Sequence, residues 1–254
     1  MKNEFDELPQ VIYVATPERT VNYRWAEGSK NISPSVKILT KESVLQLECE
    51  KPKHIMEGDI LMLHPFKENM YINVNDVQNI KYAKFYAYKR IAQQLGAIHY
   101  EVVSASQQTT KRTFGTDNHV TYGKLNDLGL NVKNEKDFLK KMGFSLKADF
   151  DGVSLISQES YDKAKQLVKE FNLETDAGIT ALIESRDPSI KNQETYEEVT
   201  CFMMNEINST LDVAFSLKAA NSVFSLDSKT TNSIENTEIV KLTIKYTFPK
   251  REAK

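Results

Sequence analysis

The first 75 residues carry the apolar runs and alternations of β-strands. A β-branched and aromatic run covers 11–14, and a continuous apolar run covers 60–63, directly after the turn-forming pair Gly58-Asp59. Apolar and polar residues alternate over 44–50, which is the period of a half-buried strand. We therefore predict three strands here, and we expect the run at 60–63 to be covered on both faces.

A helical pattern follows the β-rich part. Apolar side chains recur at helical spacing from Asp76, a suitable N-cap, to a stop at Gly96. Alternation resumes at Ile98 and continues through a stretch rich in Ser, Thr and Gln to a turn near 114–118. We predict a long β-hairpin whose return strand includes Tyr122.

The second half of the chain mixes helical and extended patterns. Helical spacing marks three segments, at 135–142, 157–171 and 196–207. Extended alternation marks three segments, at 144–150, 211–217 and 240–248. Asp151-Gly152 has the composition of a two-residue hairpin turn. Two segments stay open, since 177–185 fits a helix or a strand and 221–238 fits a loop or a solvated strand with a turn.

These patterns favour an α+β fold with mainly antiparallel sheets and several interspersed helices. The chain lacks the regular β-α-β spacing that builds a doubly wound parallel sheet. No linker rich in Pro, Gly or Ser interrupts it, so we expect a single domain over residues 1–254. The alternative is a sub-boundary near residue 75, between a β-rich N-terminal part and a mixed α/β C-terminal part.

The composition is that of an ordinary globular protein, with 40% hydrophobic and 27% charged residues. The net charge of −2 gives no overall attraction to nucleic acid or anionic lipid. Cys49 and Cys201 match no metal or redox spacing, and the N-terminus lacks a signal-peptide pattern. No apolar run approaches the ~20 residues of a membrane-spanning helix. We expect a soluble, cytoplasmic protein with reduced cysteines.

The chain shows no familiar catalytic motif. It contains no phosphate-binding loop, no dinucleotide fingerprint, no nucleophile elbow and no HExxH or CxxC metal motif. Its nine glycines also disfavour a phosphate site built from Gly-rich backbone. The sequence therefore identifies no reaction, no catalytic residue and no cofactor.

A candidate metal site surrounds the predicted turn at Gly58-Asp59. His54, Asp59 and His64 lie within eleven residues, and the two arms of a hairpin would bring both imidazoles near the carboxylate. Two nitrogen ligands and one oxygen ligand suit zinc or another borderline metal. The alternative is that both histidines are half-buried structural residues beside the turn.

The most unusual local composition lies in the predicted helix, where 81–90 contains four basic and four aromatic residues and no acid. Four of these side chains point away from the apolar stripe and are interface candidates: Tyr82, Tyr86, Lys89 and Arg90. Tyr and Arg are favoured anchors of protein interfaces. A basic aromatic surface also suits nucleic acid or an anionic membrane, and a helix packed on both sides is the structural alternative.

We expect a non-catalytic binding or assembly protein that acts through protein–protein contacts, with either a protein partner or a second copy of itself. One alternative is a metal-dependent enzyme, a hydrolase or nucleotide-handling protein without a readable motif. Another is a β-hairpin protein that perturbs or perforates membranes, since 107–113 and 221–238 are polar and β-prone. A membrane hairpin needs alternating apolar residues over ~10 positions per strand, and 109–113 supplies none.

Overall fold

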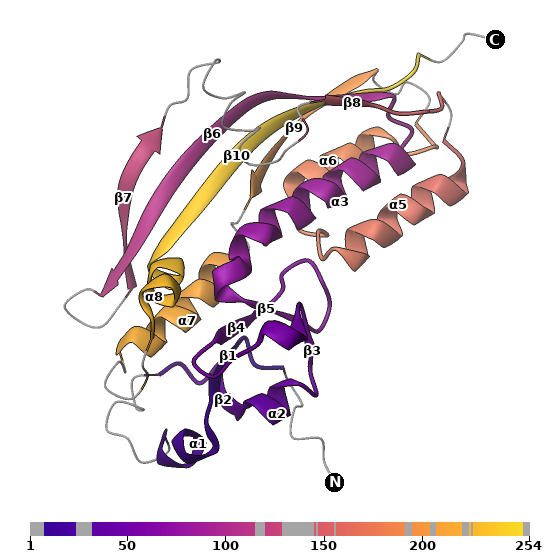
Figure 1. Cartoon of the computed structure of the whole chain (residues 1–254). Helices are drawn as coiled ribbons and strands as arrows, with labels where there is room; N and C mark the ends of the chain where they lie inside the picture. The colour runs from indigo at the N-terminus through magenta and orange to yellow at the C-terminus, as the bar shows by residue number, and fades with distance from the viewer. Residues whose placement is uncertain are drawn as a thin grey trace. The chain divides into compact units, whose positions relative to one another are not determined.

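The computed structural model describes residues 8–23, 32–114, 120–128, 145, 147–154, 156–190, 195–203, 207–219, 224 and 226–250. These residues form seven α-helices and two mostly antiparallel sheets, so the predicted α+β fold is confirmed (Figure 1). The chain divides into two compact units, each assembled from separate segments. Unit 1 comprises Met1–Asn79, Thr109–Leu125 and Asn205–Glu238, and unit 2 comprises Ile80–Gln108, Asn126–Met204 and Ile239–Lys254.

A five-stranded mixed sheet forms the centre of unit 1. Its strands are β1 (Val11–Ala15), β2 (Val36–Thr40), β3 (Glu48–Cys49), β4 (Ile60–Leu63) and β5 (Met70–Asn73), in the order β2-β1-β4-β5-β3. β1 pairs in parallel with β2 and antiparallel with β4, and all five of its residues are buried. A strand buried on both faces needs an uninterrupted apolar run, and the strands predicted at 11–14 and 60–63 are confirmed.

The half-buried strand predicted over 44–50 is wrong except at β3. Helix α2 (Lys41–Val44) ends inside this segment, and the hydroxyl of Thr40 caps its start by accepting a hydrogen bond from the backbone N of Ser43 at 3.4 Å. Val44 is fully buried whereas Leu45 is 45% exposed. The alternation therefore reflects a helix end followed by a turn, and not the two faces of a strand.

The remaining helices of unit 1 are α1 (Pro17–Tyr23), α7 (Asn208–Ala219), α8 (Ser228–Glu235) and the 3-10 helices η2 (Pro52–His54) and η3 (Val74–Asn79). The strand predicted over 211–217 is wrong, because this segment lies in α7. Ala214 and Phe215 are fully buried while Val213 is only half-buried, which is a helical pattern. Segment 221–238 contains α8, which Asp227 caps through a 2.6 Å hydrogen bond from the backbone N of Thr230.

The second sheet is antiparallel wherever its register is defined. Its strands are β6 (His99–Phe114), β7 (Val120–Leu128), β8 (Lys147–Asp149), β9 (Tyr196–Met203) and β10 (Asn236–Thr247), in the order β7-β6-β10-β9, and β8 also pairs with β6. β6, β7 and β10 each contribute residues to both units. The return strand of the long hairpin and the closing strand predicted at 240–248 are confirmed, the latter as far as Thr247.

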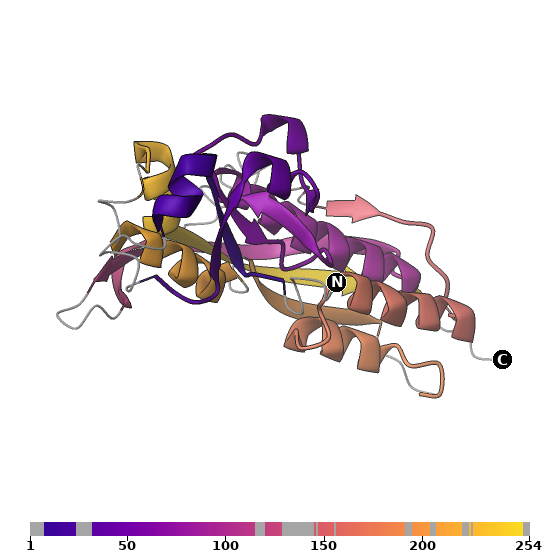
Figure 2. The same cartoon turned by 90° about the horizontal axis from the view of Figure 1, so that it is seen from below.

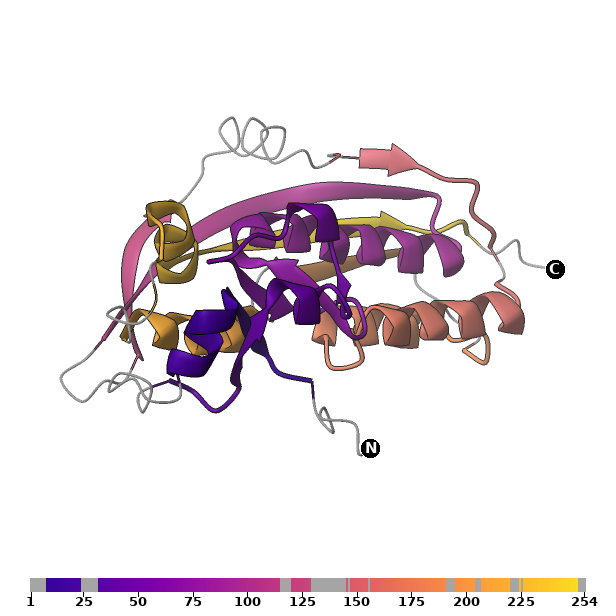
Figure 3. The same cartoon turned by 60° about the horizontal axis from the view of Figure 1, so that its bottom comes forward.

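Three helices of unit 2 lie on one side of this sheet (Figure 1). They are α3 (Ile80–Gln94), α5 (Gln158–Glu170) and α6 (Ala177–Ser185). Figure 2 shows α5 and α6 side by side, and Figure 3 shows α5 running alongside α3. α3 begins at Ile80 and not directly after Asp76, which lies in η3, and it ends as predicted before Gly96, whose φ is +83°.

Two predictions in unit 2 are wrong. The helical stripe at 196–207 lies in β9 up to Met203, where Val199, Cys201 and Met203 are buried at every second position. Asp151-Gly152 is not a hairpin turn, because β8 pairs with β6 and the described residues between this pair and α5 form no strand.

Gly152 has a packing role instead. A Cβ at this position would lie 2.4 Å from the carbonyl oxygen of Gly96 and 2.6 Å from that of Ala97. The segment around residue 152 can therefore pack against the end of α3 only because glycine has no side chain. The predicted helix at 135–142 lies outside the described residues. None of the described helices is long and apolar enough to cross a membrane.

Candidate functional site

Tyr82, Tyr86 and Arg90 form an exposed row on α3, which we call the α3 stripe. The three residues are four positions apart and therefore lie on one face of the helix. Tyr82 is 38% and Tyr86 54% exposed, and Arg90 is exposed as well. The Arg90 guanidinium lies 5.7 Å from the centroid of the Tyr86 ring, so cation and aromatic face are already in contact.

Lys89 is the predicted interface residue that turns inward. Its side chain is half-buried, and its ammonium lies 5.8 Å from the ring centroid of Tyr100 and 5.6 Å from that of Phe150. The structure thus brings three of the four predicted interface residues together on the surface and places the fourth over two aromatic rings.

The opposite face of α3 is fixed by a buried ionic cluster. The ammonium of Lys84, whose side chain is 1% exposed, lies 2.9 Å from Asp176 Oδ2 and donates to the carbonyl oxygen of Phe202 at 2.8 Å. The hydroxyl of the fully buried Tyr88 donates to the same carboxylate. This cluster connects α3 to the start of α6 and to β9.

Asp176 also caps α6, because its Oδ1 accepts hydrogen bonds from the backbone N of Gly178 at 3.0 Å and of Ile179 at 3.1 Å. Burial alone would raise the pKa of Asp176. The hydrogen bond from Tyr88 and the charge of Lys84 outweigh burial and hold this pKa below its ordinary value. Asp176 therefore stays ionised in the interior.

The structure does not bring the three residues of the predicted metal site together in one cluster. His54 is exposed at the end of η2, and Asp59 Oδ2 accepts a hydrogen bond from the backbone N of Met56 at 2.7 Å. His64 is 4% exposed, and its Nδ1 accepts from the backbone N of Phe66 at 3.0 Å. Within the part of the chain that the structure describes, no three His, Cys, Asp or Glu side chains are arranged to hold a metal ion.

The environment of His64 keeps its imidazole neutral. Burial lowers its pKa from 6.5 to about 4, and the positive charge of Lys67 acts in the same direction. Glu50, whose Oε1 lies 3.8 Å from Nε2, raises the pKa by less than these two effects lower it. A neutral acceptor is what the hydrogen bond from Phe66 requires.

His54 and Asp59 do share a polar pocket of about 520 Å³ in unit 1. The other carboxylates around it are engaged in local contacts, since Asp76 pairs with Lys51 at 3.0 Å and Asp227 caps α8. Glu50, which also lines the pocket, pairs with Lys67.

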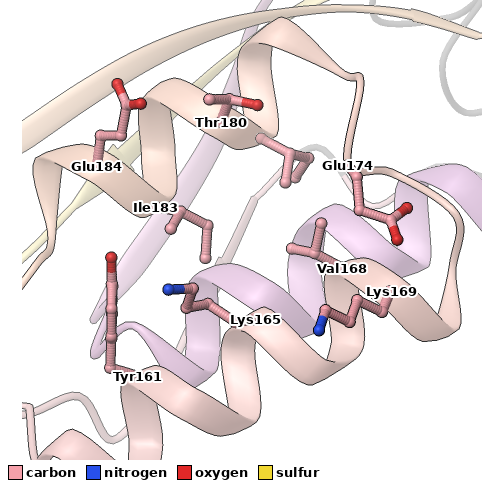
Figure 4. Close-up of a pocket in the computed structure, with 9 residues that line it drawn as sticks. Tyr161, Lys165, Val168, Lys169, Glu174, Thr180, Ile183 and Glu184 are labelled. Carbon is pink, nitrogen blue, oxygen red and sulfur yellow. The ribbon is translucent and has the colours of Figure 1, made fainter.

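A smaller pocket of about 300 Å³ lies between α5 and α6 in unit 2 (Figure 4). Its floor is apolar and consists of Val168, Ile179 and Ile183, with the ring of Tyr161 at one end. Five polar residues form its rim: Lys165, Lys169, Glu174, Thr180 and Glu184. An apolar floor with a charged rim is typical of sites for small amphiphilic molecules.

Sequence reasoning missed the buried cluster and this pocket. Lys84 was one basic residue among four in 81–90, and only the tertiary structure supplies its partner 92 positions further along the chain. A local signal for Asp176 did exist, since Asp directly before an apolar helical segment is an N-cap signature. No protein-family model, no curated protein and no solved structure matches this chain.

Proposed function

We propose that this chain is a non-catalytic assembly protein that self-associates through the α3 stripe. The observation that carries the proposal is the exposure of two tyrosines beside an arginine on one helix face. Tyr and Arg supply a large share of binding energy in protein interfaces, because each combines contact area with a polar group.

The spacing of the stripe supports a second copy as the partner. Tyr86 lies midway between Tyr82 and Arg90, so a two-fold axis at Tyr86 would place two α3 helices antiparallel. Arg90 of each copy would then face Tyr82 of the other. The two Arg90–Tyr82 contacts would lie about 12 Å apart along the helix axis, at 1.5 Å per residue. Two cation–π contacts would flank a central tyrosine pair, and each would lie beside the Lys81 ammonium, which is 5.5 Å from the Tyr82 ring centroid.

The anchored inner face of α3 favours this contact. Lys84 is held by Asp176 and the carbonyl of Phe202, so the helix does not need to become ordered on binding. A rigid platform reduces the entropic cost of association. Because one helix face buries less than about 1,000 Å², we expect a weak dimer with a dissociation constant in the micromolar range.

Sedimentation velocity over a concentration series tests the proposal. We expect the wild-type weight-average sedimentation coefficient to rise with concentration, and the Tyr86→Ala/Arg90→Ala variant to stay monomeric up to at least tenfold higher concentration. Tyr196→Ala is a matched control, because Tyr196 is 53% exposed on β9 and lies under Lys245, whose ammonium is 4.8 Å from the ring centroid.

Two results would contradict the proposal. One is a wild-type protein that remains monomeric at every concentration. The other is an oligomer that survives the double substitution, or that Tyr196→Ala disrupts to the same extent as the double substitution does.

A further inference from the structure

We propose that the pocket between α5 and α6 binds a small amphiphilic carboxylate, such as a medium-chain fatty acid anion. The apolar chain would lie on Val168, Ile179 and Ile183. The carboxylate would lie between the ammonium groups of Lys165 and Lys169. This site shares no residue with the α3 stripe, so it stands independently of self-association.

The first support is the arrangement of charge on α5. Elsewhere on this helix, residues four positions apart attract one another, as in the 2.6 Å ion pair of Glu159 with Lys163 and the 2.8 Å hydrogen bond from Gln166 to Glu170. Lys165 and Lys169 are also four positions apart, but both are cationic and repel. An anion between them would remove that repulsion.

The second support concerns the charges of these two lysines, of which Lys165 lowers the pKa of the Asp187 carboxyl and Lys169 lies on the same rim as Glu174. Among the described residues, neither Lys165 nor Lys169 forms an ion pair within 4.0 Å, and the Lys165 ammonium lies 5.2 Å from the ring centroid of Tyr161. Figure 4 shows the Glu184 carboxylate directed away from the pocket floor. A carboxylate can accept hydrogen bonds from two ammonium groups at 2.7–2.9 Å each.

The third support is the match between floor and ligand. Val168 is 8% and Ile179 0% exposed, so the apolar surface that a ligand can reach comes mainly from the half-buried Ile183. A volume of about 300 Å³ is at the lower end of the range for ligand pockets and excludes large cofactors. A single short acyl chain fits this limit.

Titration with sodium octanoate below its micellar concentration, followed by ¹H–¹⁵N NMR of the full chain, tests the proposal. We expect saturable shifts of amide signals from 161–184 and a dissociation constant of about 1 mM or lower. Lys165→Gln/Lys169→Gln should weaken octanoate binding about threefold to tenfold and leave 1-octanol binding unchanged. Lys163→Gln, on the same helix but outside the pocket, should change neither.

Ile183→Phe gives a second and independent readout. The larger side chain fills the pocket at a half-buried position, so octanoate and 1-octanol should both lose binding while the amide spectrum stays that of a folded protein. The proposal is overturned if wild type shows no saturable shifts in this segment. It is equally overturned if octylamine or 1-octanol binds as tightly as octanoate, or if the double lysine variant binds octanoate as well as wild type does.

Discussion

Replacing Lys84 with methionine removes one charge from the buried cluster and keeps most of the side-chain volume. The Lys84 side chain is 1% and the Asp176 side chain 13% exposed, so water cannot replace the lost ammonium. Breaking a buried ion pair from one side costs about 3–5 kcal/mol, because the remaining charge is left buried. Asp176 keeps hydrogen bonds from Tyr88, Gly178 and Ile179, so we expect the lower end, about 3 kcal/mol.

Urea unfolding of a double-mutant cycle measures this cost. Asp176→Asn should also destabilise strongly, because it leaves the Lys84 ammonium buried with the Phe202 carbonyl and an amide. The double variant Lys84→Met/Asp176→Asn should cost clearly less than the sum of the two single changes. Lys163→Met is the control, since Lys163 is 59% exposed in its pair with Glu159 and should cost no more than about 0.5 kcal/mol.

The pH dependence checks the same cluster from another side. The pKa of Asp176 is lowered in the folded protein, so its stabilisation is present above the unfolded value of about 3.9 and is lost as the pH falls through the folded pKa. The difference in unfolding free energy between wild type and Lys84→Met should therefore shrink as the pH falls below about 4. A cost under 1 kcal/mol at pH 7, or strict additivity in the cycle, would refute the argument.

Two further predictions concern His64 and the glycines. Since the pKa of His64 is lowered from 6.5 to about 4, the unfolded state gains a proton first, and stability should fall by about 2 kcal/mol between pH 7 and pH 5. His64→Gln should lose most of that slope in urea unfolding, and an unchanged slope would contradict the assignment. Gly152→Ala should lower the unfolding free energy by about 2–3 kcal/mol, since its Cβ would lie 2.4 Å from the Gly96 oxygen. Gly58 has a φ of +93° and nothing within 4 Å of an added Cβ, so Gly58→Ala should cost only about 1–2 kcal/mol. Equal costs for the two changes would show that steric contact at residue 152 does not determine the loss of stability.

Local patterns predicted the elements in which one burial pattern continues along the whole element. Val11–Ala15 is buried throughout, and buried residues occupy every second position of β10 around Leu242 and Ile244, so composition and period agree with structure. α5 was equally predictable, because Ser157 caps it by accepting a hydrogen bond from the backbone N of Ser160 at 3.1 Å.

The helix predicted at 196–207 is largely a strand and the strand predicted at 211–217 is a helix, and both errors have the same physical cause. A residue spacing of three and four fits a helix, but Tyr196, Val199 and Met203 lie in β9, every residue of which pairs with β10. Conversely, Leu211, Phe215 and Leu217 alternate by coincidence, and the buried Ala214 between them decides for the helix. Alanine occurs on buried and on exposed faces, so only the tertiary structure reveals which face of the helix Ala214 occupies.

Buried charges were the part of the candidate site that sequence could not reveal. Arg112 lies in the polar, β-prone segment 107–113 of the predicted hairpin, yet it is fully buried, and its Nε donates to Asp212 Oδ1 at 2.6 Å across a separation of 100 residues. Lys84 behaves in the same way with Asp176. A charged side chain enters the interior only with its partner, and that partner is defined by tertiary structure.

The Lys84–Asp176 pair also relates the two proposed surfaces to each other. Asp176 caps α6, whose Ile179 and Ile183 form the pocket floor, and it binds Lys84 on the inner face of α3. The α3 stripe occupies the other face of that helix, since positions 82 and 86 are each two residues, or about 200°, from 84. A bound carboxylate that stabilises α6 against α5 therefore acts on the element that holds α3. Self-association measured with and without octanoate would reveal this coupling, and by linkage the dimer would then bind octanoate with the same change in affinity.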